Sequence, residues 1–80
     1  MIRVRLIGHL ATHFKEEVEF QEGKISVAEL LNRLNLKGAK ITRANTLILL
    51  NGVEVSALKG EETEVNDGDS IILIPISHGG

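Results

Sequence analysis

One segment of this 80-residue sequence has the spacing of an amphipathic helix, and this constrains the possible folds more than any other feature. Its apolar residues recur at intervals of three and four, so they share one side of a helix: Val27, Leu30, Leu31 and Leu34. Ser26 and Glu29 have the spacing of a capping box, and residues 35–38 supply a stop. With a single helix, the rest of the core must come from strands.

The first half of the chain predicts two strands before the helix. Residues 2–7 and 17–21 alternate apolar and polar side chains, so each strand would turn one side to a core and the other to solvent. A loop through Thr12 joins them, and together they predict a hairpin. Residues 36–45, after the helix, lack a clean period and are expected to form a connecting loop, with a short helical turn within it as the alternative.

The second half of the chain predicts three more strands. Residues 46–50 and 53–55 flank Asn51-Gly52, a pair that accepts the positive φ angles of a type I′ hairpin turn. Residues 66–69 have the composition of a tight turn that leads into residues 71–76. Because residues 71–76 are apolar on both faces, they are typical of a central strand.

The predicted order is β-β-α-β-β-β, in which one helix connects two hairpin-like halves. A mixed sheet of four to five strands with one helix packed across one face is the α+β architecture of the β-grasp, or ubiquitin-like, fold. A ferredoxin-like split fold is disfavoured because it needs a second helix. A chain of this size supports one core, so we expect a single β-grasp domain over residues 1–76 and a flexible tail over residues 77–80 that ends in Gly-Gly. Residues 56–63 are expected to be a polar loop.

Composition excludes several classes of function. The formal net charge is -2 and the nine Lys and Arg residues are scattered, so no direct nucleic-acid partner is expected. Cysteine is absent, which excludes disulfides, thiolate metal sites, cysteine nucleophiles and a persulfide carried on a side chain. The sequence has neither a leader nor an apolar run of membrane-spanning length, so a cytoplasmic protein with no membrane partner is expected.

The sequence ends in His78-Gly79-Gly80, directly behind the apolar segment 71–76. Two glycines lack side chains, so the last peptide units can pass through a narrow channel and adopt backbone angles that a Cβ would forbid. The group that they present is the α-carboxylate of Gly80, which is ionised at neutral pH and must be activated before it can react. The alternative interpretation is a frayed, inert terminus.

Alternation along residues 71–76 separates two apolar sets, and only one of them can fill a small core. If the helix covers Ile71 and Leu73, the other face forms an apolar patch beside the tail, which often marks a partner site on a small protein. A loop or a second copy of the chain that covers the patch is the alternative. The residues that we expect to dock a partner are Ile72, Ile74, Pro75 and Ile76.

No catalytic or metal site is expected within the chain. Asp67 and Asp69 lack further ligands at calcium spacing and are expected to form a turn. His9 and His13 are expected on surface loops, because no cysteine or carboxylate cluster gives them metal spacing. The glycines are isolated turn residues with no nucleotide-binding fingerprint, so ATP is expected to bind a partner only.

These features resemble the ubiquitin-like sulfur carriers, a family that includes the small subunit of molybdopterin synthase (MoaD), the thiamine-pathway carrier, the ubiquitin-related modifier and the archaeal small modifiers. The resemblance covers almost the whole chain in element order, and its specific part is Leu50-Asn51-Gly52 together with residues 67–80. Pro75 is similar to the molybdopterin branch, whereas His78-Gly79-Gly80 is similar to the ubiquitin-related modifier. Ile76 stands where the molybdopterin carriers often have a second proline.

The resemblance implies that an adenylating activating enzyme uses ATP to adenylate the Gly80 carboxylate, and that a sulfurtransferase then replaces AMP with sulfur. The sulfur would be carried covalently at Gly80 as a thiocarboxylate, with Gly79 and His78 threading the tail into the partner. The favoured acceptor would be a synthase large subunit of molybdopterin biosynthesis. A tRNA thiolation or thiamine pathway is the alternative. The chain itself would bind no cofactor and would be a carried substrate or the non-catalytic small subunit of a synthase, not an enzyme.

Two other functions fit the same sequence. A protein modifier would join its activated Gly80 to lysine side chains of target proteins, as ubiquitin-like proteins do. A non-covalent β-grasp interaction domain would bind partners with an inert tail, and loss of Gly79 and Gly80 would then leave its activity unchanged.

Overall fold

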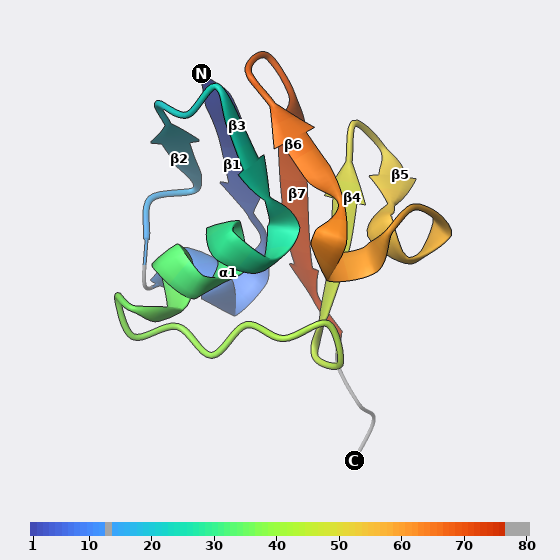
Figure 1. The fold of residues 1–80 in the computed structure, drawn as a ribbon. Coiled ribbons are helices and arrows are strands. Elements are labelled where there is room, and N and C mark those ends of the chain that lie inside the picture. The colour runs from blue at the N-terminus through green and yellow to red at the C-terminus, as the bar shows by residue number, and fades with distance from the viewer. Residues whose placement is uncertain (13, 77–80) are drawn as a thin grey trace.

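The computed structural model describes residues 1–12 and 14–76 and contains a five-stranded mixed sheet (Figure 1). Strand β7 is central in this sheet, parallel to β1 and antiparallel to β4, and the strand order is β2-β1-β7-β4-β5. The strands are β1 (Ile2–Leu6), β2 (Glu17–Phe20), β4 (Thr46–Leu50), β5 (Val53–Glu54) and β7 (Ser70–Pro75). The five predicted strands and the central place of the last one are therefore confirmed.

A second, two-stranded sheet was not predicted. It pairs β3 (Lys24–Ser26) with β6 (Glu64–Asn66), and Ile25 lies opposite Val65 with both side chains buried. By composition, Glu22-Gly23-Lys24 is expected to form a turn after residues 17–21, and this expectation is wrong for Lys24, which begins β3. Strands of three residues are too short to show an alternating pattern. Their pairing also joins a segment that precedes the helix in the sequence with one that follows it.

Short 3-10 helices occupy three segments that the sequence assigns to loops and a strand end. They are η1 (Gly8–Thr12), η2 (Val55–Ala57) and η3 (Gly60–Glu62). Val55 was predicted to end the strand over residues 53–55, but β5 ends at Glu54, where the chain turns and the Glu54 carboxylate accepts a hydrogen bond from the Ser56 N–H at 3.1 Å. This turn buries the Val55 side chain in the core instead of continuing the strand.

Helix α1 (Val27–Asn35) begins and packs as its sequence predicts. Ser26 is the N-cap, and its hydroxyl oxygen accepts a hydrogen bond from the Glu29 N–H at 3.1 Å. Arg33 on the solvent side is hydrogen-bonded to Glu22 and lies 3.5 Å from the Glu29 carboxylate. The hydrogen bond with Glu22 raises the pKa of the Arg33 guanidinium above its ordinary value. The four apolar residues predicted to share one side of the helix are all buried.

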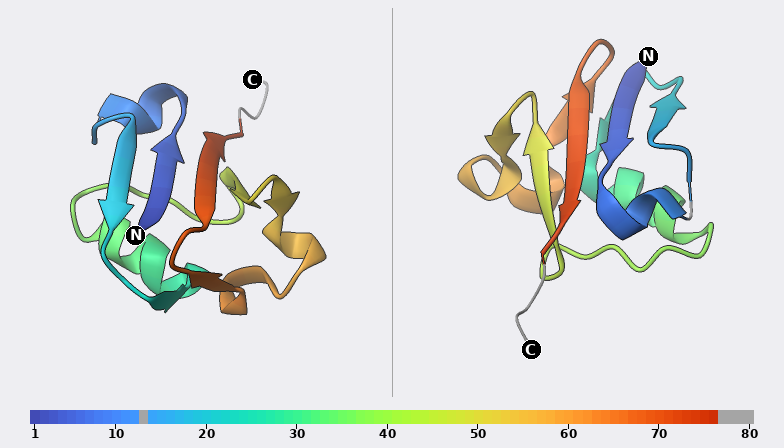
Figure 2. Two further views of the ribbon diagram at one scale, coloured as in Figure 1. Left: turned by 90° about the horizontal axis from the view of Figure 1, so that it is seen from above. Right: turned by 180° about the vertical axis from the view of Figure 1, so that it is seen from behind.

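The core lies between α1 and one face of the large sheet. The buried apolar residues of its three inner strands are Ile2, Val4, Leu6, Ile48, Ile71 and Leu73. Seen from behind, β1, β7 and β4 present their other face, with α1 on the far side (Figure 2, right). We call this other face of the sheet the open face. No helix among the described residues is both long and apolar enough to span a membrane.

Two turns at the edge of the sheet are joined by one side chain. Asn51 and Gly52 have φ angles of 49° and 86°, which confirms the predicted type I′ hairpin. The Asn51 side chain donates to the Asp69 carboxylate at 3.0 Å and accepts from the Ser70 N–H at 2.9 Å. Asp69 also accepts from the Asn66 N–H at 2.8 Å, so it stabilises its own turn as predicted.

Candidate functional site: the open face and the end of strand β7

The predicted reactive and threading residues, Gly80, Gly79 and His78, lie outside the described residues. The structure does describe the surface from which they follow, namely strand β7 and Ile76. The candidate site is therefore built from the open face of the sheet and from the contacts that hold the end of β7.

An apolar patch occupies the centre of the open face. Ile72 and Ile74 are half-buried there, whereas Ile71 and Leu73 between them are 1% and 0% exposed. The predicted separation of the two apolar sets is thus correct: Ile71 and Leu73 belong to the core. Ile76 follows the end of the strand and is 43% exposed. The predicted strand extends one residue too far, since β7 ends at Pro75.

Strand β4 contributes the other half of the patch, which was not predicted from the sequence. Leu49 lies directly opposite Ile72, and Leu47 lies opposite Ile74. Both leucines are half-buried, in contrast to the fully buried Ile48 between them. Residues 46–50 are almost as apolar on both faces as residues 71–76, so the same signal could have identified them. We name Leu47, Leu49, Ile72 and Ile74 the open-face patch.

Charged residues flank the patch on the side of β1 and β2. Arg5 pairs in register with Ile72 on one side and with Glu17 on the other. A groove of about 240 Å³ runs over this boundary and is lined by Arg3, Arg5, Glu17, Ser70, Ile71 and Ile72. The open face therefore has an apolar centre and a polar border, the arrangement that protein interfaces commonly use.

Pro75 packs against Gly8 at the end of β7. Gly8 has a φ angle of 63°, and a Cβ placed on it would lie 3.3 Å from the Pro75 Cγ. By strand alternation Pro75 is on the side of Leu73, in register with the buried Thr46. Pro75 thus contacts the fold itself, whereas Ile72 and Ile74 belong to the open face.

We expect Gly8→Ala to destabilise the protein by about 1 to 3 kcal/mol, because an L-residue would be forced into the left-handed region and against Pro75. Chemical denaturation of both proteins measures the difference. Gly23→Ala is the matched control, since Gly23 has an ordinary φ angle and nothing within 4 Å of an added Cβ. Equal stability of the Gly8 and Gly23 variants would contradict a close contact between Gly8 and Pro75.

Asn45 is hydrogen-bonded to Ile76, the residue that follows β7. The Ile76 N–H donates to the Asn45 carbonyl oxygen at 2.8 Å. The Asn45 side chain holds its own loop, because it accepts from the Thr42 N–H at 2.9 Å and donates to the Lys40 carbonyl oxygen at 2.8 Å. A proline at position 76 could not donate this bond. No sequence signal pointed to Asn45, since the bond joins residues that are far apart in the chain.

The described part of the site has the features of a docking surface. Residues 1–12 and 14–76 contain no group of three or more His, Asp or Glu side chains that could hold a metal ion. The open-face patch, by contrast, offers apolar area that a partner would remove from water. A partner bound there would also lie near Ile76, the residue that precedes residues 77–80.

Comparison with known proteins supplies independent information about the chain. The model of the ThiS family matches residues 4–80. The small archaeal modifier protein 1 (SAMP1) from Methanosarcina acetivorans has a similar structure, with a TM-score of 0.78 and 26% identity over 99% of this chain and 95% of that chain. A chain in the complex of subunits 1 and 2 of the molybdopterin-converting factor from Helicobacter pylori has a TM-score of 0.69 and 26% identity, over 99% of this chain and 97% of that chain. A search of the curated proteins finds no match.

A further similar structure bears on the fold alone. A chain in the BexX/CysO complex from Amycolatopsis orientalis has a TM-score of 0.76 and 24% identity, with full coverage of both chains. The neighbours are β-grasp, ubiquitin-like proteins, so the predicted fold class is confirmed.

Proposed function

Since this chain belongs to the ThiS family of ubiquitin-like sulfur carriers, we propose that its reactive group is the α-carboxylate of Gly80. In this role the chain is a carrier and not an enzyme, and the catalytic residues and the ATP site are on its partners. The observation that carries the proposal is the family match through residue 80, together with an uncovered apolar patch on the strand that leads to the terminus.

The proposed chemistry takes two steps. The Gly80 carboxylate attacks the α-phosphorus of ATP on an activating enzyme, which releases pyrophosphate and leaves an acyl-adenylate. Hydrosulfide supplied by a sulfurtransferase then attacks the carbonyl carbon, and the C–O bond to AMP breaks as the C–S bond forms, so that Gly80 ends as a thiocarboxylate. Activation is needed because an ionised carboxylate is a poor electrophile, whereas a mixed anhydride with AMP has a good leaving group.

The open-face patch and Ile76 are proposed to dock the partner proteins. Burial of apolar area yields about 25 cal/mol per Å², and the central apolar residues of an interface commonly dominate its affinity. Ile72 and Ile74 are only half-buried, so they retain area that a partner can cover. Because Pro75 contacts Gly8 and Ile76 is bonded to Asn45, the terminal residues leave from a defined point beside this patch.

The favoured sulfur acceptor is the large subunit of a molybdopterin synthase. This choice is supported by the 26% identity to a chain of the Helicobacter pylori molybdopterin-converting factor, which was solved as a complex of two subunits, and by Pro75. Thiamine synthesis and tRNA thiolation are the other acceptor pathways.

Protein modification is a second candidate function. It is supported by the 26% identity and TM-score of 0.78 to SAMP1, whose name describes a small archaeal modifier. A modifier would use the same adenylate at Gly80, but a lysine amine would attack the carbonyl carbon in place of sulfur. An isopeptide would form and AMP would leave.

Intact-protein mass spectrometry tests the two candidates directly. The chain is incubated with ATP, the activating enzyme of the same organism and a sulfur source, and we expect one oxygen to be replaced by sulfur at Gly80. The control omits ATP and should leave the mass unchanged. An unchanged mass with an active enzyme would reject the carrier chemistry, and Gly-Gly remnants on lysines of cellular proteins would then identify a modifier.

A further inference from the structure

Positive charge in this acidic chain is concentrated in one loop. Residues 30–53 contain no Asp or Glu, although the chain has eleven of them, and they contain four of its nine Lys and Arg residues. Three of the four lie between the end of α1 and the start of β4: Lys37, Lys40 and Arg43. We name this segment, residues 36–45, the basic loop.

The basic loop is held firmly to the core although its cations are exposed. Ala39 and Ile41 are 4% and 2% exposed, and they alternate with the exposed Lys40. The Asn35 side chain donates to the Ile41 carbonyl oxygen at 2.9 Å and accepts from the Ile41 N–H at 2.8 Å. The backbone therefore presents its charged side chains from a fixed support.

The three cations have no ion-pair partner among residues 1–12 and 14–76. Arg43 lies over the backbone of Gly60, where an added Cβ would be 2.6 Å from the Arg43 Nη1. Neighbouring carboxylates on Glu61 and Glu62 do not form a salt bridge with it. The positive charge of the basic loop is thus left available to another molecule.

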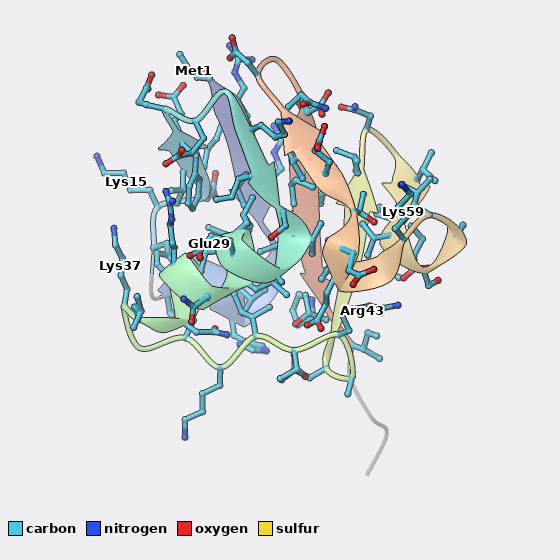
Figure 3. The ribbon with its side chains drawn as sticks, in the orientation of Figure 1. Met1, Lys15, Glu29, Lys37, Arg43 and Lys59 are labelled. Atoms are coloured by element: carbon cyan, nitrogen blue, oxygen red, sulfur yellow. The ribbon has the colours of Figure 1, made fainter. Side chains whose placement is uncertain are left out.

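The basic loop is hydrogen-bonded to Ile76, the last described residue before the C-terminal residues 77–80. Asn45 donates from its side chain to the Lys40 carbonyl oxygen and accepts from the Ile76 N–H with its own carbonyl oxygen, both at 2.8 Å. Asn45 therefore connects Lys40 to Ile76 through two hydrogen bonds. Figure 3 shows Arg43 near the lower ends of β4 and β7, whereas Lys37 lies at the opposite end of the basic loop.

An enzyme that takes up Gly80 must bring the rim of its active-site entrance close to Ile76. That rim would then face Lys40 and Arg43, and carboxylates are the groups that match unpaired cations best. Nucleic acid fits less well, because its binding grows with the number of phosphates neutralised and the rest of this chain is acidic. We propose that Lys40 and Arg43 contact an acidic rim around the entrance through which the adenylating enzyme receives the C-terminal residues.

This inference rests on the proposed function, and its test compares two double charge reversals in the full chain. Lys40→Glu/Arg43→Glu changes the basic loop, whereas Lys15→Glu/Lys24→Glu makes the same change in net charge at two exposed lysines outside it. Lys15 lies across the molecule from Arg43 (Figure 3), and Lys24 pairs in register with Asn66, before the turn that leads into the start of β7. We measure the Kd for the adenylating enzyme of the same organism without ATP, at low and high salt, and then KM and kcat for ATP-pyrophosphate exchange.

We expect the basic-loop variant to raise both Kd and KM by about tenfold or more and to leave kcat unchanged, because charges at a rim act on encounter and binding. Wild-type binding should weaken with salt and the variant should lose most of that dependence. The control variant should behave like the wild type. Lys40→Gln/Arg43→Gln removes the charges without reversal and should give an intermediate Kd.

Three results would overturn the inference. They are an equal loss of binding in both charge reversals, no binding of the wild type to the enzyme, and binding of a tRNA transcript that the basic-loop variant alone loses while enzyme binding is unchanged. Failure of the proposed function is a separate result: the wild type would bind the enzyme but would not be adenylated. The Kd comparison would still decide the role of Lys40 and Arg43.

Discussion

A chain shortened to end at His78 is expected to fold like the full chain and to lose adenylation by at least about 100-fold, since misplacement of a reacting group by a residue or less has effects of this size. Without Gly79 and Gly80 the new carboxylate lies closer to the domain and carries an imidazole beside it. A channel that admits only glycine would exclude that side chain. ATP-pyrophosphate exchange with the activating enzyme measures the loss.

The fold of the shortened chain should be intact because, among residues 1–12 and 14–76, the buried core ends at Leu73 and the last backbone hydrogen bond is that from the Ile76 N–H to the Asn45 carbonyl oxygen. An unchanged thermal unfolding curve is the control for this expectation. Gly80→Ala keeps the length of the chain and adds one methyl group. It therefore separates the effect of a shorter chain from the effect of a side chain that the channel excludes. If the shortened chain still supported adenylation or full activity in its host, an inert-tail interaction domain would be the better interpretation.

Leu73→Ala is expected to destabilise the protein by about 2 to 5 kcal/mol, which is the usual cost of removing a buried leucine. Leu73 is 0% exposed at the centre of β7, between Leu6 on β1 and Ile48 on β4. In a small domain this loss should lower Tm by more than about 10 °C. Calorimetry or urea denaturation of the purified variant gives both quantities.

Ile74→Ala is the matched control, because it shortens the next side chain of the same strand on the open face. Ile74 already contacts solvent, so we expect a loss of only about 1 kcal/mol in stability, with a clear loss of affinity for the activating enzyme. The two variants should therefore separate stability from docking. Equal destabilisation by both would mean that the open face is not free to receive a partner.

Much of the fold follows from local patterns in the sequence. The apolar residues of α1 predict its buried side, and Ser26 predicts its start, because helix periodicity and capping involve neighbours only a few residues apart. The Asn51-Gly52 pair predicts its hairpin for the same reason. Strands β3 and β6 lack such a signal, since each has three residues and gains stability only from pairing with the other.

The candidate site was predictable only in part. Alternation along residues 71–76 separates Ile72 and Ile74 from Leu73, but the sequence leaves open which set the helix covers. Leu47 and Leu49 carry the same two-sided signal, yet their place opposite Ile74 and Ile72 depends on strand register. Asn45 and Gly8 have no local signal, because their roles depend on contacts with Ile76 and Pro75 far along the chain.

The sequence by itself determined helix α1, the strands of the large sheet, the absence of cysteine and the chemistry available at Gly80, because these depend on residue type and on near neighbours. The tertiary structure alone decided which face of β7 is buried, that β4 completes the open-face patch, and that Asn45 ties the basic loop to Ile76. The physical reason is that burial, register and long-range hydrogen bonds depend on the packing of the whole chain. A local pattern constrains a residue's neighbours along the chain, whereas packing selects its neighbours in space.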